Sequence, residues 1–365
     1  MGLICLPVAA LLAGIRLESL LAIPGIFVAD FALNSYLLLF GTCGFALLFG
    51  VPTAWLTSTA KFPGRKVFEW LLVLPLALPA YIIAYTYKGI FDPFGTTKKW
   101  FGFHMEVDTL PFLCLFMGAV LYPYVYLVSR SVFLKHSQRL EEAAKSLGYS
   151  GRQNFFKLVL PLSRPAIVGG LSLVAMEVLN NYGAVQYYGV KTFTTELIRM
   201  WNPLDLQPVI GISASLLVLV FLLFQGERWQ RRKARHFEMG TGAASRKRNK
   251  LSGVNGIGAF LLCFFPLMIG FVIPVVQLGF WAYPKIEVLL EPSFLSMLFN
   301  TFSMAFLAAI SCMLAALLTA FVHRLYPKPA IGFLSRLSTL GYAVPGAVIG
   351  IGVLIPLSFL NQQFG

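Results

Sequence analysis

The sequence predicts an all-α protein that crosses a membrane several times. Hydrophobic residues make up 58% of the 365 residues and charged residues only 12%, and the mean hydropathy is +0.75. Soluble domains contain about 45–50% apolar and about 25% charged residues. Most of this chain therefore has lipid rather than water as its solvent.

Nine apolar runs are long enough to be membrane-spanning helices, since a hydrocarbon core about 30 Å thick needs about 20 apolar residues per crossing. Arg16 and Glu18 interrupt the first run, which lacks the basic start of a signal peptide, so we expect it to belong to a first membrane helix. The runs lie at about residues 3–24, 31–57, 67–91, 109–132, 164–188, 206–225, 256–281, 297–322 and 333–360.

The basic residues predict which side of the membrane each loop faces. With the N-terminus in the cytoplasm, 22 of the 29 Lys and Arg residues fall in cytoplasmic loops, where such residues collect. This bias accounts for the net charge of +14 without nucleic acid. The basic run around residues 228–250 is typical of a cytoplasmic linker that faces anionic lipid headgroups.

A repeat divides the chain at that linker. At an ungapped offset of 266 residues, Asn34 aligns with Asn300 and Pro79 with Pro345, together with several apolar pairs. We expect a first transmembrane half of about six helices at residues 1–226, a linker at 227–252 and the start of a second half at 253–365. Pro75, Pro79 and Pro345 are expected to break helices rather than to bind ligands.

The loop between the fourth and fifth runs has the pattern of a docking element. Leu140, Ala143, Ala144 and Leu147 are spaced as one narrow apolar stripe on a short helix, which Gly148 can end. Small alanine side chains would let a partner's backbone approach closely. The alternative is a loop helix that lies on the lipid headgroups.

A second helical turn follows in the same loop. Ser150 and Gln153 have the spacing of a capping box, and Pro161 is expected to end the turn that they open.

The residues of this loop also match a known motif. The string EAAKSLGYSGRQNFFKLVLP resembles the EAA motif of binding-protein-dependent ABC importer permeases. Leu158 stands where isoleucine is usual. The other matching residues are Glu142, Ala143, Ala144, Gly148, Phe155, Leu160 and Pro161.

This resemblance implies a function for the chain. The fold would be a type I ABC importer permease bundle in a bacterial inner membrane, with residues 139–161 as a coupling helix seated on a cytoplasmic ATPase dimer. The chain has no GxxxxGK[ST] phosphate loop, so ATP would be used by the partner and no cofactor would be bound directly. A periplasmic binding protein would deliver the substrate.

Three stretches resemble the ferric-iron branch of these permeases, whose members carry two fused halves. They are residues 74–85, 176–201 and 342–354, although Asn181 stands where that branch would have an acidic residue. Thiamine, sulfate, polyamine and phosphonate permeases share the coupling motif, so they remain alternative readings. By the repeat, a second motif would begin near residue 408, which predicts that the second half is incomplete here.

The fifth run carries the candidate translocation path. Glu177, Asn180 and Asn181 have helical spacing on one face, and polar groups at membrane depth normally face a bundle interior. Carboxylate and phenolate oxygens suit Fe(III). The alternative is that the amides join helices by hydrogen bonds and the tyrosines form an interface belt. Gln186, Tyr187 and Tyr188 complete the candidate set.

Two other classes of protein fit the sequence less well. An ion-coupled secondary transporter would need no coupling loop and would carry more intramembrane acids. A membrane enzyme lacks support, because the four histidines are scattered in or next to loops and no Cys or His spacing indicates a metal site.

Overall fold

The computed structural model describes residues 25–135, 146, 148–202, 206–234, 249–325, 331 and 345–354. The predicted first segment at 3–24 lies outside these residues. The described residues fall into two compact units, one within residues 16–275 and the other within residues 276–365.

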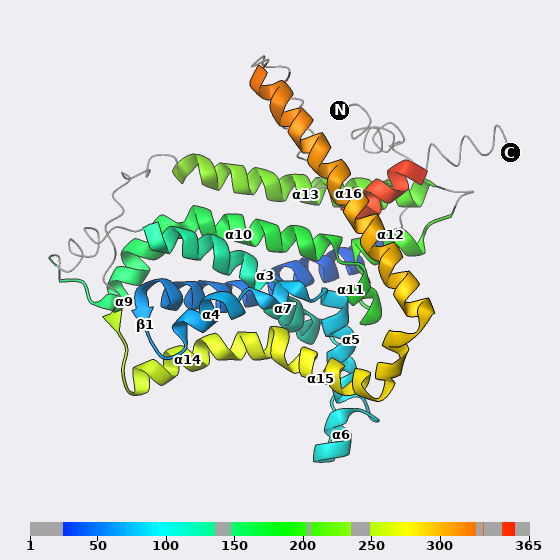
Figure 1. Ribbon diagram of the computed structural model, residues 1–365. Coiled ribbons are helices and arrows are strands. Elements are labelled where there is room, and N and C mark those ends of the chain that lie inside the picture. Colours follow the sequence, from blue (N-terminus) through cyan, green and yellow to red (C-terminus); the bar gives the residue numbers. More distant parts are fainter. Residues whose placement is uncertain are drawn as a thin grey trace. The chain divides into compact units, whose positions relative to one another are not determined.

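The larger unit is a bundle of long helices (Figure 1). Its main helices are α3 (Gly25–Thr59), α7 (Leu110–Lys135), α10 (Leu160–Asn180), α13 (Gln207–Ala234) and α14 (Val254–Leu267). Gly170 sets the contact of α10 with α7, because a Cβ placed there would lie 2.8 Å from Cα of Val125. Small residues allow such close packing in membrane bundles.

The prediction of an all-α polytopic protein is confirmed. Five helices among the described residues are long and apolar enough to cross a membrane, and a bent pair makes a possible sixth. Four of the five correspond to predicted runs at 31–57, 109–132, 256–281 and 297–322. The fifth, Phe155–Asn180, corresponds to the run at 164–188 but ends eight residues earlier.

The predicted helix at 67–91 is broken instead of continuous. It consists of α4 (Arg65–Leu71), the 3-10 turn η1 (Leu74–Ala77) and α5 (Ala80–Phe91), and the direction changes by 90° between the parts. Leu78, with φ −100° and ψ 122°, is extended because the following Pro79 disfavours helical backbone before it. The expectation that the prolines break helices is confirmed here.

The 266-residue repeat stays a prediction, and two pairs of features have its spacing. Shifting the bounds of α3 by that offset gives 291 and 325, and α16 runs from Pro292 to Leu325. The Pro79 carbonyl accepts hydrogen bonds from the third and fourth amides after it, at 3.0 and 3.4 Å, and the Pro345 carbonyl does the same at 2.9 and 3.1 Å. The exact division at 226 and 252 stays a prediction.

The helix that follows the linker packs against the first half. The Phe68 ring of α4 lies 5.1 Å from the Phe260 ring of α14, with an edge-on geometry. Two short strands, β1 (Ala60–Lys61) and β2 (Asn249–Lys250), pair in parallel beside them. The remaining elements are α6 (Thr96–Phe101), α9 (Gly151–Asn154), the π-helical turn η2 (Phe155–Val159), α11 (Gly183–Tyr187), α12 (Phe193–Arg199), the π-helical turn η4 (Met268–Val272), α15 (Ile273–Ala282) and η5 (Tyr283–Leu290).

Candidate coupling loop and translocation path

The coupling motif is only partly described. Glu142, Ala143 and Ala144 lie outside the described residues, so their place on a helix stays a prediction. Gly148 has φ +75°, the left-handed conformation that favours glycine, and a Cβ added there would meet no atom within 4 Å. This is the backbone that a helix-ending glycine adopts, as the sequence predicts.

The capping box after Gly148 is present. The Ser150 amide donates to Oε1 of Gln153 at 2.9 Å, and the Gln153 amide donates to Oγ of Ser150 at 3.3 Å. The predicted end at Pro161 is wrong, because α9, η2 and α10 follow one another without a break. Pro161 is the second residue of α10, and the wider hydrogen bonding of the π-helical turn directly before it lets the helix continue through the proline.

Phe155 anchors the end of the coupling motif to two membrane helices. Its ring centroid lies 4.8 Å from that of Trp55 on α3 and 6.5 Å from that of Phe133 on α7, and the last two rings are 5.5 Å apart. Leu158, like Leu160, is half-buried. In this structure the motif's phenylalanine is therefore a packing anchor, whereas Gly148 is exposed.

A charged cluster ties three helices together at the same end of the bundle. Glu69 on α4 pairs with Arg65, and its Oε1 lies 3.0 Å from Nη2 of Arg130 on α7. Arg65 also donates to the Thr57 carbonyl of α3 at 3.0 Å, and the Tyr126 hydroxyl donates to the Glu69 carbonyl at 3.4 Å. The sequence analysis missed this cluster.

One of the ion pairs in this cluster could have been predicted from the sequence. Arg65 and Glu69 are four residues apart on a helix, a spacing that favours an ion pair. Arg130 lies 61 positions after Glu69, and only the folded chain brings them together. Since α7 continues from Arg130 to Lys135 and into the coupling loop, the cluster links that loop to α3 and α4.

The predicted path residues do not share one face. The Glu177 carboxylate accepts a hydrogen bond from the Tyr124 hydroxyl of α7 at 3.3 Å. Asn180 is exposed at the last position of α10. Asn181 has left the helix, with φ −80° and ψ 100°, and its Oδ1 accepts from the Ala184 amide at 3.0 Å. The prediction of a shared face is wrong at Asn181, because this residue lies outside the helix and its side chain caps the start of α11.

Tyr187 lies in an exposed group of side chains at the other end of the bundle. Nζ of Lys88 is 5.2 Å above its ring, and the Tyr85 ring is 5.7 Å away. Lys88 also pairs with Asp108 at 3.1 Å. Gln186, the preceding residue, is exposed. Partial burial raises the pKa of Tyr187, although Lys88 opposes the shift.

Tyr188 is buried, and its hydroxyl has no hydrogen-bond partner among the described residues. Burial raises the pKa of Tyr188, and the carboxylate of Asp108 raises it further. The surroundings of Tyr187 and Tyr188 therefore favour neutral phenols over the phenolates that would bind a hard cation. In the part of the chain that the structure describes, no three His, Cys, Asp or Glu side chains are grouped to hold a metal.

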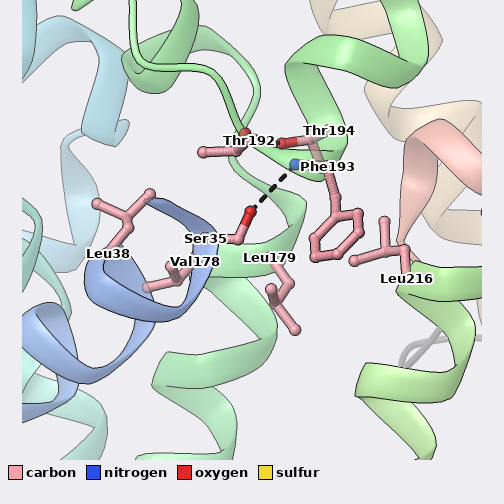
Figure 2. Close-up of a pocket in the computed structure, with 8 residues that line it drawn as sticks. All are labelled: Ser35, Leu38, Val178, Leu179, Thr192, Phe193, Thr194 and Leu216. Atoms are coloured by element: carbon pink, nitrogen blue, oxygen red, sulfur yellow. Dashed lines mark hydrogen bonds between the residues drawn. The ribbon is translucent and has the colours of Figure 1, made fainter. Parts of the chain in front are cut away.

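A small cavity lies between α3, α10, α12 and α13 (Figure 2). The Phe193 amide donates to Oγ of Ser35 across it at 3.1 Å, and Oγ1 of Thr192 lies 3.0 Å from Oγ1 of Thr194. The polar groups at its wall bind one another, so the cavity is a packing gap and not a substrate site. Its lining residues are Ser35, Leu38, Val178, Leu179, Thr192, Phe193, Thr194 and Leu216.

Comparisons with known proteins agree with the coupling motif. The chain is 26% identical to the Fe(3+)-transport system permease protein FbpB 2 of Haemophilus influenzae. This alignment of 350 residues covers 92% of this chain and 65% of the relative. It is 31% identical to the sulfate permease CysT of Escherichia coli, over 48% of this chain and 64% of the relative. A molybdate/tungstate permease, WtpB of Thermococcus kodakarensis, is 26% identical over 56% of this chain and 78% of its own length.

The chain thus spans just under two thirds of the first two of these relatives. Residues 25–236 match the family described as the binding-protein-dependent transport system inner membrane component. This match runs from the start of α3 past the end of α13 and includes the coupling loop. The chain therefore belongs to this family of inner-membrane components, the permeases of ABC importers.

Proposed function

We propose that this chain forms the pathway of an ATP-driven importer, in which a separate ATPase dimer binds the coupling loop and a periplasmic binding protein delivers ferric iron. The observation that carries the proposal is the EAA-type loop between α7 and α10, with its left-handed Gly148 and its capped second turn. The chain's own membership in a permease family supports it.

The contacts around the loop suggest how ATPase movement would reach the membrane helices. A displacement of the loop would act on α10 through η2, which joins it without a break, and on α3 through the Phe155–Trp55 contact. It would act on α4 through the Arg130–Glu69 ion pair. Because α4 leads through the proline break into α5, this route ends beside Tyr85 and Tyr187.

Ferric iron is the proposed cargo because the iron-permease relative aligns with most of the chain, including the start of the second half. The sulfate and molybdate relatives align with about half of it. An importer of such oxyanions is the second candidate, and the neutral state favoured for Tyr187 and Tyr188 is compatible with it.

Uptake by proteoliposomes tests the proposal. The full permease would be reconstituted with the ATPase and the binding protein of the same organism, and radiolabelled ferric iron, sulfate and molybdate would be compared. We expect uptake of iron that requires ATP and the binding protein. Uptake of sulfate or molybdate alone would replace the substrate assignment, and uptake driven by an ion gradient without ATPase would reject the importer.

The sidedness is part of the proposal. With the N-terminus in the cytoplasm, residues 228–250 and the coupling loop face the cytoplasm. A cysteine introduced at Lys250 should react with a membrane-impermeant reagent only in inside-out vesicles. Labelling in right-side-out vesicles would show that the chain has the opposite orientation.

A further inference from the structure

We propose that residues 92–105 form an aromatic anchor in the phospholipid headgroup region, on the side of the membrane where α7 begins. The anchor consists of the side chains of Phe94, Trp100, Phe101 and Phe103, which are 86%, 67%, 70% and 51% exposed. Such an exposed aromatic group is unusual for a surface in water and marks an interaction site.

The position of this segment relative to the membrane follows from α7. The spanning helix Leu110–Leu134 has 25 residues, and at about 1.5 Å per residue it is longer than a hydrocarbon core of about 30 Å. The residues just before Leu110 therefore lie at the membrane surface. The Lys88–Asp108 ion pair, at 3.1 Å, brings the last turn of α5 to the same level.

The segment is held firmly to α5. Oγ1 of Thr97, which is buried, donates to the Ile90 carbonyl at 2.8 Å, and the Gly95 amide donates to the Asp92 carbonyl at 2.8 Å. Thr97 is buried, whereas Trp100 and Phe101 of the same short helix remain exposed. Figure 1 shows α6 past the end of α5, away from α10 and α13.

The chemistry of the segment fits a lipid surface better than a protein partner. The acidic side chain within residues 92–105 is Asp92, whose Oδ1 accepts a hydrogen bond from the Phe94 amide at 2.9 Å, and Lys98 and Lys99 adjoin the aromatic residues. Tryptophan and phenylalanine bury their rings at the boundary between headgroups and acyl chains, while lysines bind the phosphates. The 90° bend before α5 directs the segment sideways from the spanning helices, along the membrane surface.

Fluorescence quenching of Trp100 tests this proposal in the whole permease reconstituted into liposomes. The difference between the native protein and W100F isolates the Trp100 signal, and the change from tryptophan to phenylalanine keeps an aromatic ring. Phospholipids brominated near the start of the acyl chain should quench Trp100 about twofold more than those brominated near its end, because an anchor lies near the headgroups. Aqueous iodide should quench it weakly.

Trp55 provides the matched control, since its ring packs between Phe133 and Phe155. Its signal, isolated with W55F, should respond less than that of Trp100 to the shallow bromines. Strong quenching of Trp100 by iodide but not by bromolipids would place the segment in water and overturn the proposal. Quenching by neither, or protection of Trp100 only after the binding protein is added, would assign the surface to a protein partner and overturn it as well.

Discussion

Replacing Gly148 by valine should disrupt the coupling loop through the backbone alone. Gly148 has φ +75°, and among the described residues no atom lies within 4 Å of an added Cβ, so the backbone conformation is what opposes a side chain here. An L-residue in this left-handed conformation costs about 1–2 kcal/mol, and a β-branched residue is near the upper end. At about 1.4 kcal/mol per tenfold change, the population of the native turn should fall roughly 5- to 30-fold.

Gly151 is the control, because it is also exposed and has no atom within 4 Å of an added Cβ, but it is helical and its φ is not positive. Valine is a better helix former than glycine, so G151V should keep or improve the local structure. Co-purification with the ATPase and ATP-dependent uptake should decline strongly for G148V, less for G148N and little for G151V, since asparagine tolerates the left-handed region. Equal behaviour of G148V and G151V would refute the reasoning.

Three further changes test the bundle. Glu69→Gln leaves two arginines without their counter-charge and should lower the free energy of unfolding by about 1–3 kcal/mol; an unchanged thermal denaturation curve in detergent would argue against the cluster. Gly170→Ala places a Cβ 2.8 Å from Val125 and should destabilise by about 1–3 kcal/mol, whereas Gly44→Ala, with open space, should not; equal midpoints would contradict the close packing. Glu177→Gln keeps a hydrogen-bond acceptor for its partner on α7 and should reduce uptake by about tenfold without loss of ATPase co-purification, and normal uptake would remove this residue from the path.

Local features of the structure could be predicted from the sequence. The capping box of Ser150 and Gln153 depends on residues three positions apart, and the helix break before Pro79 depends on the proline ring itself. Long apolar runs predict helices because a single helix satisfies its own backbone hydrogen bonds within lipid. The size of the bend at Pro79, 90°, could not be predicted from the sequence, since it depends on how the helical segments before and after the proline pack.

Features that depend on long-range contacts escaped the sequence analysis. Arg130 and Tyr124 meet their acidic partners only after α7 has packed against α4 and α10. Helical spacing placed Asn181 on the face of Glu177, but the capping preference of asparagine decided its position instead. Pro161 shows the same conflict, because the π-helical turn before it accommodates the residue that was expected to end the helix.

The contact between Phe68 and Phe260 has a consequence for biosynthesis. The two residues are 192 positions apart, so the ribosome completes the first half before α14 exists to cover that face of α4. At about 5–20 residues per second, this interval lasts on the order of ten seconds or more. During it the newly inserted half presents an incomplete surface to lipid, to the insertion machinery or to membrane proteases. Maturation of the first half therefore depends on translation of the linker and the helix after it.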